Sequence, residues 1–178
     1  LGAGTVIYMI LVQNVFRYCR HNAAKWGISQ IGVMGYSAGG HLAGCASTMF
    51  TDTVTRPDFS VLIYPVITFE DGVTHNDTRN NLLGYARWHD RSMNIDEWEK
   101  AQKQYAELIQ RYSLEHQVNA DTPPTFLAHS GDDRTVPVEN SLRYYNSLTR
   151  HGVPAEMHIY PTGGHGWSFR SEKFLGKG

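Results

Sequence analysis

The chain has 178 residues, 41% of them hydrophobic and 19% charged, and its formal net charge at pH 7 is −1. These values predict one globular domain with a sizeable core and exclude a disordered chain. The small net charge argues against nucleic acid or a membrane surface as a partner, and no run reaches the roughly 18 apolar residues of a membrane span.

Helical and strand patterns alternate along the first part of the chain. Their periodicity predicts, in order, a helix over 12–26, a strand over 30–34, a helix over 38–49 and a strand over 59–66. The last of these, FSVLIYPV, is almost continuously apolar, as expected for a parallel strand covered on both faces. The run TVIYMILV over 5–12 is compatible with a further strand, although it would enter the following helix with almost no connecting loop.

The second part resumes the alternation after an irregular region. Residues 70–94 predict a polar loop, and Asp96 with Glu99 three residues later predicts a capping box that begins a helix. The apolar stripe of this helix is Trp98, Ala101, Tyr105, Leu108 and Tyr112. There follow a strand over 122–130, a helix from Pro137 with Val138, Leu142, Tyr145 and Leu148 on one face, and a strand over 155–161. The sequence therefore predicts a single α/β domain over 1–178, with a mostly parallel sheet and flanking helices.

The cysteines and the opening segment bear on the cellular compartment. Cys19 and Cys45 lie on different predicted helices, and both are predicted to be buried free thiols because disulfide scaffolds carry more cysteines. The opening LGAGTVIYMILVQ lacks the positive region and the small-residue cleavage site of a signal peptide. The sequence does not begin with methionine, so localisation stays open between secreted, periplasmic and cytoplasmic, as does the oligomeric state.

The segment GYSAG at 35–39 stands between a predicted strand and a predicted helix, which is the context of a nucleophile elbow. A tight turn there would force the backbone of Ser37 into a strained conformation and present its hydroxyl above the strand ends. Gly35 and Gly39 are expected to remove Cβ atoms that would otherwise clash. The N–H of Ala38, at the helix start, would point toward a developing oxyanion.

A serine hydroxyl becomes a good nucleophile only when a base takes its proton and a carboxylate orients that base. In this arrangement the acid and then the histidine follow the serine along the chain. Asp132 and Asp133 come directly after a predicted strand, and Asp133 is the predicted acid because the next residues turn into a helix. His165 is the predicted base, on a glycine-rich loop after the last strand. Asp132 is predicted to be a turn or capping group.

The other histidines are interpreted as structural residues. His41 lies on the same predicted helix as the serine and is expected to pack, and His129 lies within the strand that leads to the aspartates. No cluster of cysteine, histidine and carboxylate residues has zinc spacing, and no glycine loop matches a nucleotide-binding pattern. The sequence therefore predicts neither a metal nor another cofactor.

Four separated segments, matching in order, carry a family resemblance. They are IGVMGYSAGGHLAG, THNDTRNNLLG, TPPTFLAHSGDDRTVPVENSLRYYNSL and VPAEMHIYPTGGHGWSF. Over roughly residues 13–170 the chain resembles the bacterial α/β-hydrolase esterases of the acetylxylan or carbohydrate acetyl esterase type. This resemblance implies cleavage of short acyl esters, often acetyl groups on plant polysaccharide, with Ser37 as nucleophile, His165 as general base and acid, and Asp133 as its orienting partner.

Two features depart from that family. Its members carry a glycine-rich loop of the His-Gly-Gly type well before the elbow, but only 36 residues precede Ser37. The chain also stops soon after His165, where a closing helix is expected. We therefore expect a partial α/β-hydrolase domain that lacks its N-terminal strands and C-terminal helix. One missing oxyanion donor costs about 10²–10³ in rate, so the piece alone is expected to be weakly active or inactive.

Three functions stay open from the residues. The first is an esterase of small esters or acetylated carbohydrates; the second is a peptidase or amidase of the same fold; the third is a non-catalytic remnant. Residues 70–119 are expected to form a cap or rim over the pocket. Tyr36, Trp167 and Trp88 are candidates for stacking on a sugar, although aromatic side chains more often simply pack.

Overall fold

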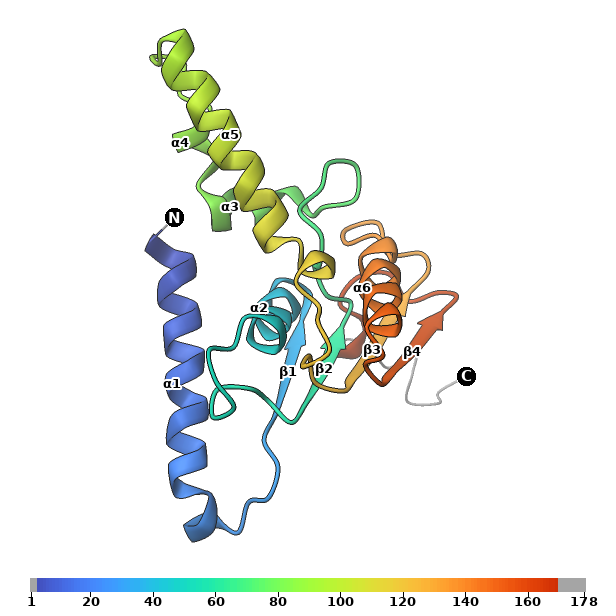
Figure 1. Cartoon of the computed structure of the whole chain (residues 1–178). Helices are drawn as coiled ribbons and strands as arrows, with labels where there is room; N and C mark the ends of the chain where they lie inside the picture. The colour runs from blue at the N-terminus through green and yellow to red at the C-terminus, as the bar shows by residue number, and fades with distance from the viewer. Residues whose placement is uncertain (1–2, 170–178) are drawn as a thin grey trace.

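The computed structural model describes residues 3–169, which form one sheet with helices around it (Figure 1). The four strands, in sheet order, are β1 (Gly32–Tyr36), β2 (Phe59–Ile63), β3 (Thr125–Ser130) and β4 (Ala155–Tyr160). The helices are α1 (Ala3–Trp26), α2 (Ser37–Thr48), α3 (Asn76–Leu83), α4 (Tyr85–Trp88), α5 (Ile95–Tyr112) and α6 (Glu139–Arg150), with short 3-10 helices η1 (Leu114–His116) and η2 (Trp167–Phe169). All the strand pairs are parallel, so the mostly parallel sheet that the sequence predicts is confirmed.

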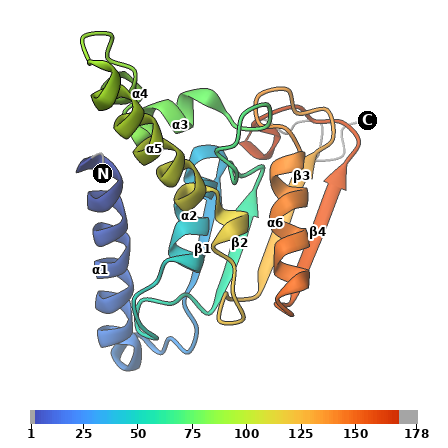
Figure 2. The same ribbon diagram turned by 45° about the horizontal axis from the view of Figure 1, so that its top comes forward.

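The main core lies on the face of the sheet that carries α2 and α6, which both stand in front of the strands in Figure 2. Leu62 and Leu127, register partners on β2 and β3, are fully buried there. Ala43 from α2 and Tyr144 and Leu148 from α6 belong to the same cluster. Burying side chains of this size stabilises the fold by about 1.5–3 kcal/mol each.

The opposite face of the sheet carries a smaller cluster. Ile63, Tyr64 and Ala128 are buried there, with Trp167 packed against them. Farther from the strand ends the same face is open, and the Met34 side chain is 56% exposed. The carboxyl ends of the strands are therefore the best-covered part of this face.

Two helical parts extend beyond the sheet, although α4 and α5 contribute Trp88, Ala101, Tyr105 and Tyr112 to the core. α1 packs beside α2 and is fastened by ion pairs from Arg17 to Asp52 and from Arg20 to Asp58. Neither α1 nor any other described helix combines the length and the apolar character needed to cross a bilayer. The α4–α5 pair projects away from the sheet as an arm (Figure 1).

The region around the arm differs most from the sequence prediction. Residues 70–94 are not one irregular loop, because they contain α3 and α4. The capping box lies two residues before the predicted one, with Asn94 as the N-cap. The Asn94 side chain accepts the N–H of Glu97, and the Glu97 carboxylate accepts the N–H of Asn94. α3 could not be predicted because its sequence, NDTRNNLL, has no helical spacing of apolar residues. Only Arg79 and Leu83 of this helix are buried.

Smaller corrections concern α1, α6 and one cysteine. The run over 5–12 belongs to α1 and is not a strand. Cys45 is buried as predicted, but Cys19 is only half-buried, and both are free thiols. The buried residues of α6 are Asn140, Ser141, Tyr144, Ser147 and Leu148. Of the predicted apolar face only Leu148 is fully buried, because this helix meets its neighbours largely through hydrogen-bonding side chains.

Candidate active site

The turn between β1 and α2 holds Ser37 in a left-handed backbone conformation, with φ at 53°. A Cβ at Gly35 would lie 2.2 Å from the carbonyl oxygen of Gly39, so the close approach of the two segments requires glycine there. A Cβ at Gly39 would meet nothing within 4 Å, which makes the expected clash at that position wrong. The second required glycine is Gly40, whose Cβ would lie 2.7 Å from that of Pro65.

The three residues singled out in the sequence lie in contact at the carboxyl edge of the sheet. The Ser37 Oγ lies 2.8 Å from Nε2 of His165, and Nδ1 of His165 lies 2.7 Å from Oδ2 of Asp133. An ionised carboxylate only accepts hydrogen bonds, so Nδ1 carries the proton and Nε2 is left to accept the serine hydroxyl. The Asp133 side chain is fully buried and the His165 ring is 22% exposed.

The environment of Asp133 favours its ionised form. Burial alone would raise the pKa of this carboxyl group. Hydrogen bonds from His129, Val136, His165 and Thr135 outweigh the burial and lower the pKa from 3.8 to about 2. The group that faces His165 is therefore a carboxylate at any pH near neutrality.

The loop that carries His165 is shaped by glycines and by Asp132. Gly163, Gly164 and Gly166 all have positive φ, and a Cβ at Gly163 would lie 2.5 Å from the Ser130 Oγ. Asp132 Oδ1 accepts the N–H of Gly164 at 2.8 Å. Asp132 therefore ties the acid loop to the histidine loop, a contact between segments that the sequence alone does not reveal.

Tyr64 is a residue of this site that the sequence pattern missed. It is buried just past β2, with φ at 37°, and its ring meets the His165 ring edge-on at 4.9 Å between centroids. Trp167 and Tyr36 pack against Tyr64 on its other sides, at 5.8 and 6.1 Å. No residue type or spacing signals this role, because aromatic residues at strand ends are common in any sheet.

The aromatic residues considered as sugar contacts are distributed differently from expectation. Tyr36 and Trp167 are half-buried and support the His165 loop through Tyr64. Trp88 is 4% exposed, belongs to the core, and donates its indole N–H to the carbonyl of Leu83. The Trp88 prediction is therefore wrong, since a buried indole offers no face to a ligand.

A cavity of about 600 Å³ adjoins the turn. Ala38, Gly39 and Leu42 from α2 form one wall, and residues 75–84, which include α3, form another. Tyr8 and Met9 of α1 complete the lining, most of which is apolar. Ala38 lies in the first turn of α2, where backbone N–H groups have no acceptor within the helix, so the cavity opens beside potential oxyanion donors.

Two other side chains of α2, His41 and Cys45, are buried and have shifted pKa values. Burial lowers the pKa of His41 to about 4, against the effect of its hydrogen bond to the Tyr112 carbonyl, and the ring stacks on Phe69. Burial raises the pKa of the Cys45 thiol to about 12. Near neutral pH the first is therefore no base and the second no thiolate nucleophile.

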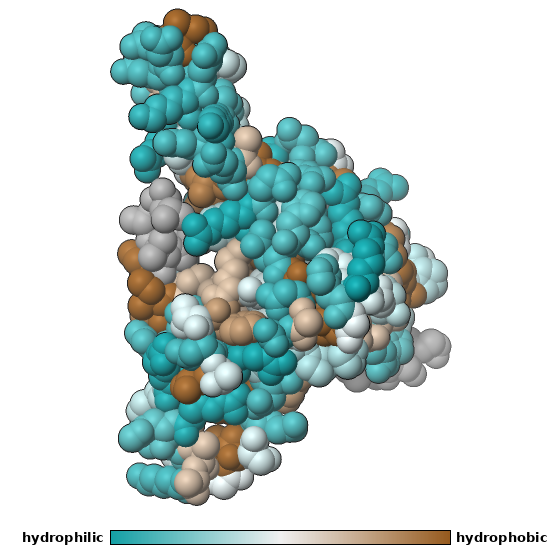
Figure 3. All heavy atoms as spheres, in the orientation of Figure 1, coloured by the Kyte–Doolittle hydropathy of each residue, from teal (hydrophilic) through white to brown (hydrophobic). Residues whose placement is uncertain are grey.

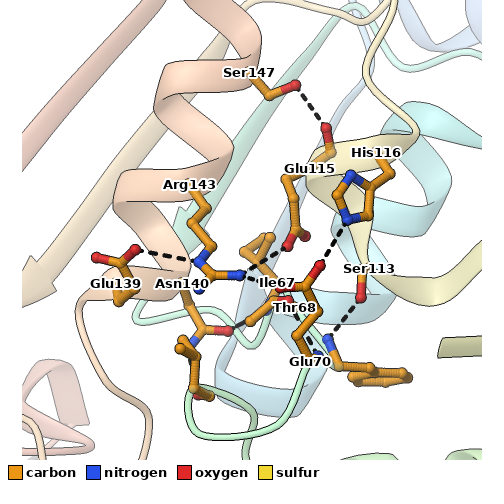
Figure 4. Close-up of polar contacts among 12 residues, drawn as sticks. Ile67, Thr68, Glu70, Ser113, Glu115, His116, Glu139, Asn140, Arg143 and Ser147 are labelled. Carbon is orange, nitrogen blue, oxygen red and sulfur yellow. Dashed lines mark hydrogen bonds and ion pairs between the residues drawn. The ribbon is translucent and has the colours of Figure 1, made fainter. Parts of the chain in front are cut away.

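A polar cluster away from the turn resembles a metal site by composition. Glu70, Glu115 and His116 place possible ligand atoms within 4.8 Å of one another. Arg143 enters the same space, with Nη1 2.6 Å from Glu70 and 3.8 Å from Glu115 (Figure 4). The Arg143 guanidinium already supplies the positive charge between the two carboxylates. The cluster is therefore better explained as a set of ion pairs that joins α6, η1 and the loop after β2 than as a cation site.

Known proteins similar to this chain include hydrolases named for carbohydrate substrates. The acetylxylan esterase of Xylanibacter ruminicola is 37% identical over 162 residues, which are 89% of this chain and 30% of that protein. Endo-1,4-beta-xylanase B of Butyrivibrio fibrisolvens is 32% identical over 176 residues, 92% of this chain and 25% of that protein. The solved acetyl ester-xyloside bifunctional hydrolase of Caldicellulosiruptor lactoaceticus has a TM-score of 0.75 at 38% identity.

That alignment covers 92% of this chain and 58% of the solved one. The chain thus spans less than a third of the curated relatives and somewhat over half of the solved structure. The predicted resemblance to acetylxylan esterases and the predicted α/β-hydrolase fold are both confirmed by these matches. Residues 13–174, nearly the whole chain, match the prolyl oligopeptidase family, and the chain therefore belongs to that family.

Proposed function

We propose that this chain carries the catalytic residues of a serine esterase. The observation that supports it is the unbroken contact from the Ser37 hydroxyl through His165 to the buried Asp133, at 2.8 and 2.7 Å. These separations are the ones a base needs to take a proton and an acid needs to orient the base. The left-handed backbone of Ser37 supports the same assignment, since strain of this kind concentrates at active sites.

In the proposed reaction Ser37 Oγ attacks the ester carbonyl carbon while Nε2 of His165 takes the hydroxyl proton. The resulting oxyanion accepts the N–H of Ala38 at the start of α2. As the ester bond breaks, His165 returns the proton to the departing alcohol and an acyl-serine remains. His165 then takes a proton from water, whose oxygen attacks the acyl carbon. As the bond between the acyl carbon and Ser37 Oγ breaks, His165 returns that proton to Oγ, and the acid and the free serine are released.

The proposed substrates are short acyl esters, especially acetyl groups on carbohydrate. The names of two relatives, an acetylxylan esterase and an acetyl ester-xyloside hydrolase, support this class. α3, within the proposed cap segment 70–119, contributes to the wall of the apolar cavity beside Ala38. The chain spans only part of each relative, so a full esterase activity like that of the relatives is also part of this proposal.

The family description supports a second candidate, a peptidase or amidase with the same three residues. An amide has a poorer leaving group than an ester, so its cleavage depends more strongly on proton donation by His165. Parallel assays on an acetyl ester and an aminoacyl anilide separate the two candidates. Faster turnover of the anilide would favour the peptidase.

A fluorophosphonate probe tests the catalytic assignment without knowledge of the substrate. The wild-type chain should be labelled, and Ser37→Ala should abolish labelling while retaining its circular dichroism spectrum. Ser92→Ala, at an exposed serine near the arm tip, is the matched control and should label like wild type. Absence of labelling in the folded wild-type chain would support the non-catalytic remnant instead.

A further inference from the structure

A second histidine lies close to Asp133. His129 sits near the end of β3 and is fully buried. Its Nε2 lies 2.9 Å from the carbonyl oxygen of Val136 and 3.4 Å from Oδ2 of Asp133. Its Nδ1 lies 2.8 Å from the Oγ of Ser141, which is fully buried on α6.

Hydrogen-bond chemistry fixes the orientation of this ring. A backbone carbonyl only accepts, so Nε2 of His129 carries a proton that it donates to Val136, and this nitrogen also lies 3.4 Å from Oδ2 of Asp133. In the neutral ring Nδ1 must then accept, and the hydroxyl of Ser141 is the donor that meets it. Ser141 therefore favours the tautomer that places a protonated nitrogen, and not a lone pair, 3.4 Å from the carboxylate.

The two oxygens of Asp133 have different partners. Oδ1 accepts the backbone N–H groups of Thr135 and Val136, both at 2.9 Å. Oδ2 accepts the Nδ1–H of His165 at 2.7 Å and lies 3.4 Å from the protonated Nε2 of His129. The backbone thus holds one oxygen, whereas the oxygen that orients His165 is held by side chains alone.

We propose that His129 is a positioning residue that holds Oδ2 of Asp133 against Nδ1 of His165, and that Ser141 selects the tautomer of His129 that does so. This inference rests on the proposed catalytic function of Ser37, His165 and Asp133. It assigns a role to two buried polar residues that the reaction itself does not use. It also gives a role to the hydrogen bond between α6 and β3, which joins Ser141 to His129 next to the loop that carries Asp133.

The test compares three variants with a matched control. His129→Leu removes the donor, His129→Gln keeps an N–H at the end of a side chain of similar length, and Ser141→Ala removes the tautomer selection. Ser147→Ala, the control, deletes another buried serine hydroxyl of α6 that bonds to the Glu115 carbonyl instead. Two readouts are measured: the downfield proton resonance of His165 Nδ1–H, and the rate of fluorophosphonate labelling against pH.

His129→Leu should lose or broaden the downfield resonance, and its labelling rate should fall about 10- to 100-fold, the loss expected for one hydrogen bond to a charged group. The acid limb of its pH–rate profile should move to lower pH, because a misplaced carboxylate stabilises the imidazolium of His165 less. Ser141→Ala should show the same changes at smaller size. His129→Gln should restore most of the rate, and Ser147→Ala should resemble wild type.

The proposal is overturned if folded His129→Leu keeps the wild-type resonance and profile, or if Ser147→Ala changes them as much as Ser141→Ala. Should His129→Leu fail to fold, Ser141→Ala decides by the same readouts. Failure of the proposed function looks different. A folded wild-type chain that is not labelled would refute the catalytic role of Ser37, while the resonance would still show whether His129 positions Asp133.

Discussion

At the scale of single residues, the two strained non-glycine backbones of the described chain both lie beside the His165 ring. Ser37 and Tyr64 are the non-glycine residues with positive φ in the described part of the chain. One donates its hydroxyl to Nε2 of His165, and the other lays its ring edge against the same imidazole. Each strained conformation costs on the order of 1–3 kcal/mol, so the surrounding packing must hold both in place. Both strained residues contact His165, so the strain is located beside the residues that are proposed to react.

Asp133 should make the stability of the fold depend on pH. Its folded-state pKa, about 2, lies below the ordinary 3.8 because its hydrogen bonds outweigh the opposing effect of burial. A depressed pKa gives stability that is fully present above the unfolded value and is lost as the pH falls through the folded one. This contribution amounts to about 2 kcal/mol.

Urea unfolding of wild type and Asp133→Asn between about pH 6 and about pH 2.5 measures that contribution. The free-energy gap between the two proteins should be largest near pH 6 and should narrow as the pH falls. Asp121→Asn, at an exposed aspartate in the loop before β3, should run parallel to wild type throughout. A constant gap for Asp133→Asn would contradict the stabilising role of the ionised carboxylate.

At the scale of elements, the strand–turn–helix of β1 and α2 should distinguish its glycines. Gly35→Ala would drive a Cβ to 2.2 Å from a backbone oxygen, so it should cost about 1–3 kcal/mol or more. Gly39→Ala enters open space within a helix and should be neutral or stabilising by up to about 1 kcal/mol. Thermal unfolding of the two variants checks the difference, and equal losses would show that the elbow is less tightly packed than described.

The elements that the sequence predicts correctly are those with a strong local signal. The buried strand β2 is almost continuously apolar, and β3 has an apolar centre, FLA. The elbow combines a serine with small residues between a strand and a helix. α3 escaped prediction because the burial of Arg79, which bonds to the Phe69 carbonyl and to Asp71, depends on tertiary contacts. Sequence pattern indicates apolar periodicity, but it does not indicate an arginine that is buried through its hydrogen bonds.

The same limit applies to the candidate site. Ser37, Asp133 and His165 were found because each follows a strand at a recognisable offset, and parallel strands bring their carboxyl ends to one edge. Tyr64 and the His129–Ser141 pair were not found, because their significance lies in contacts between segments. Residue type and order indicate the proposed reacting groups, whereas three-dimensional packing shows which residues contact them.

At the scale of the whole molecule, the sheet acts as a frame that unites distant parts of the chain. The Ser37–His165 contact spans 128 residues and the Asp133–His165 contact spans 32. All three side chains leave the sheet at the same edge because β1, β3 and β4 run in one direction. A register slip in any of these strands would separate the groups by about 3.3 Å, more than a hydrogen bond tolerates.

The outer surface of α1 leads to a prediction for the molecule as a whole. Ile7, Leu11, Val15 and Tyr18 follow helical spacing on one side of the helix and are all more than half exposed. Figure 3 shows a hydrophobic patch on the left edge of the molecule, just below the grey atoms. A contiguous exposed apolar stripe of this kind binds hydrophobic dyes and promotes association.

The chain should therefore enhance the fluorescence of anilinonaphthalene sulfonate while remaining folded. Replacing Leu11 and Val15 together by glutamine should lower that fluorescence and the light scattering of concentrated solutions. Because both side chains are exposed and glutamine forms helices well, unfolding free energy should change by about 0.5 kcal/mol or less per site. Ile95→Gln, at the exposed start of α5, is the control and should leave most of the dye signal. A loss of several kcal/mol in the α1 variant would mean that this face is packed against protein, because only a buried face loses so much on conversion to glutamine.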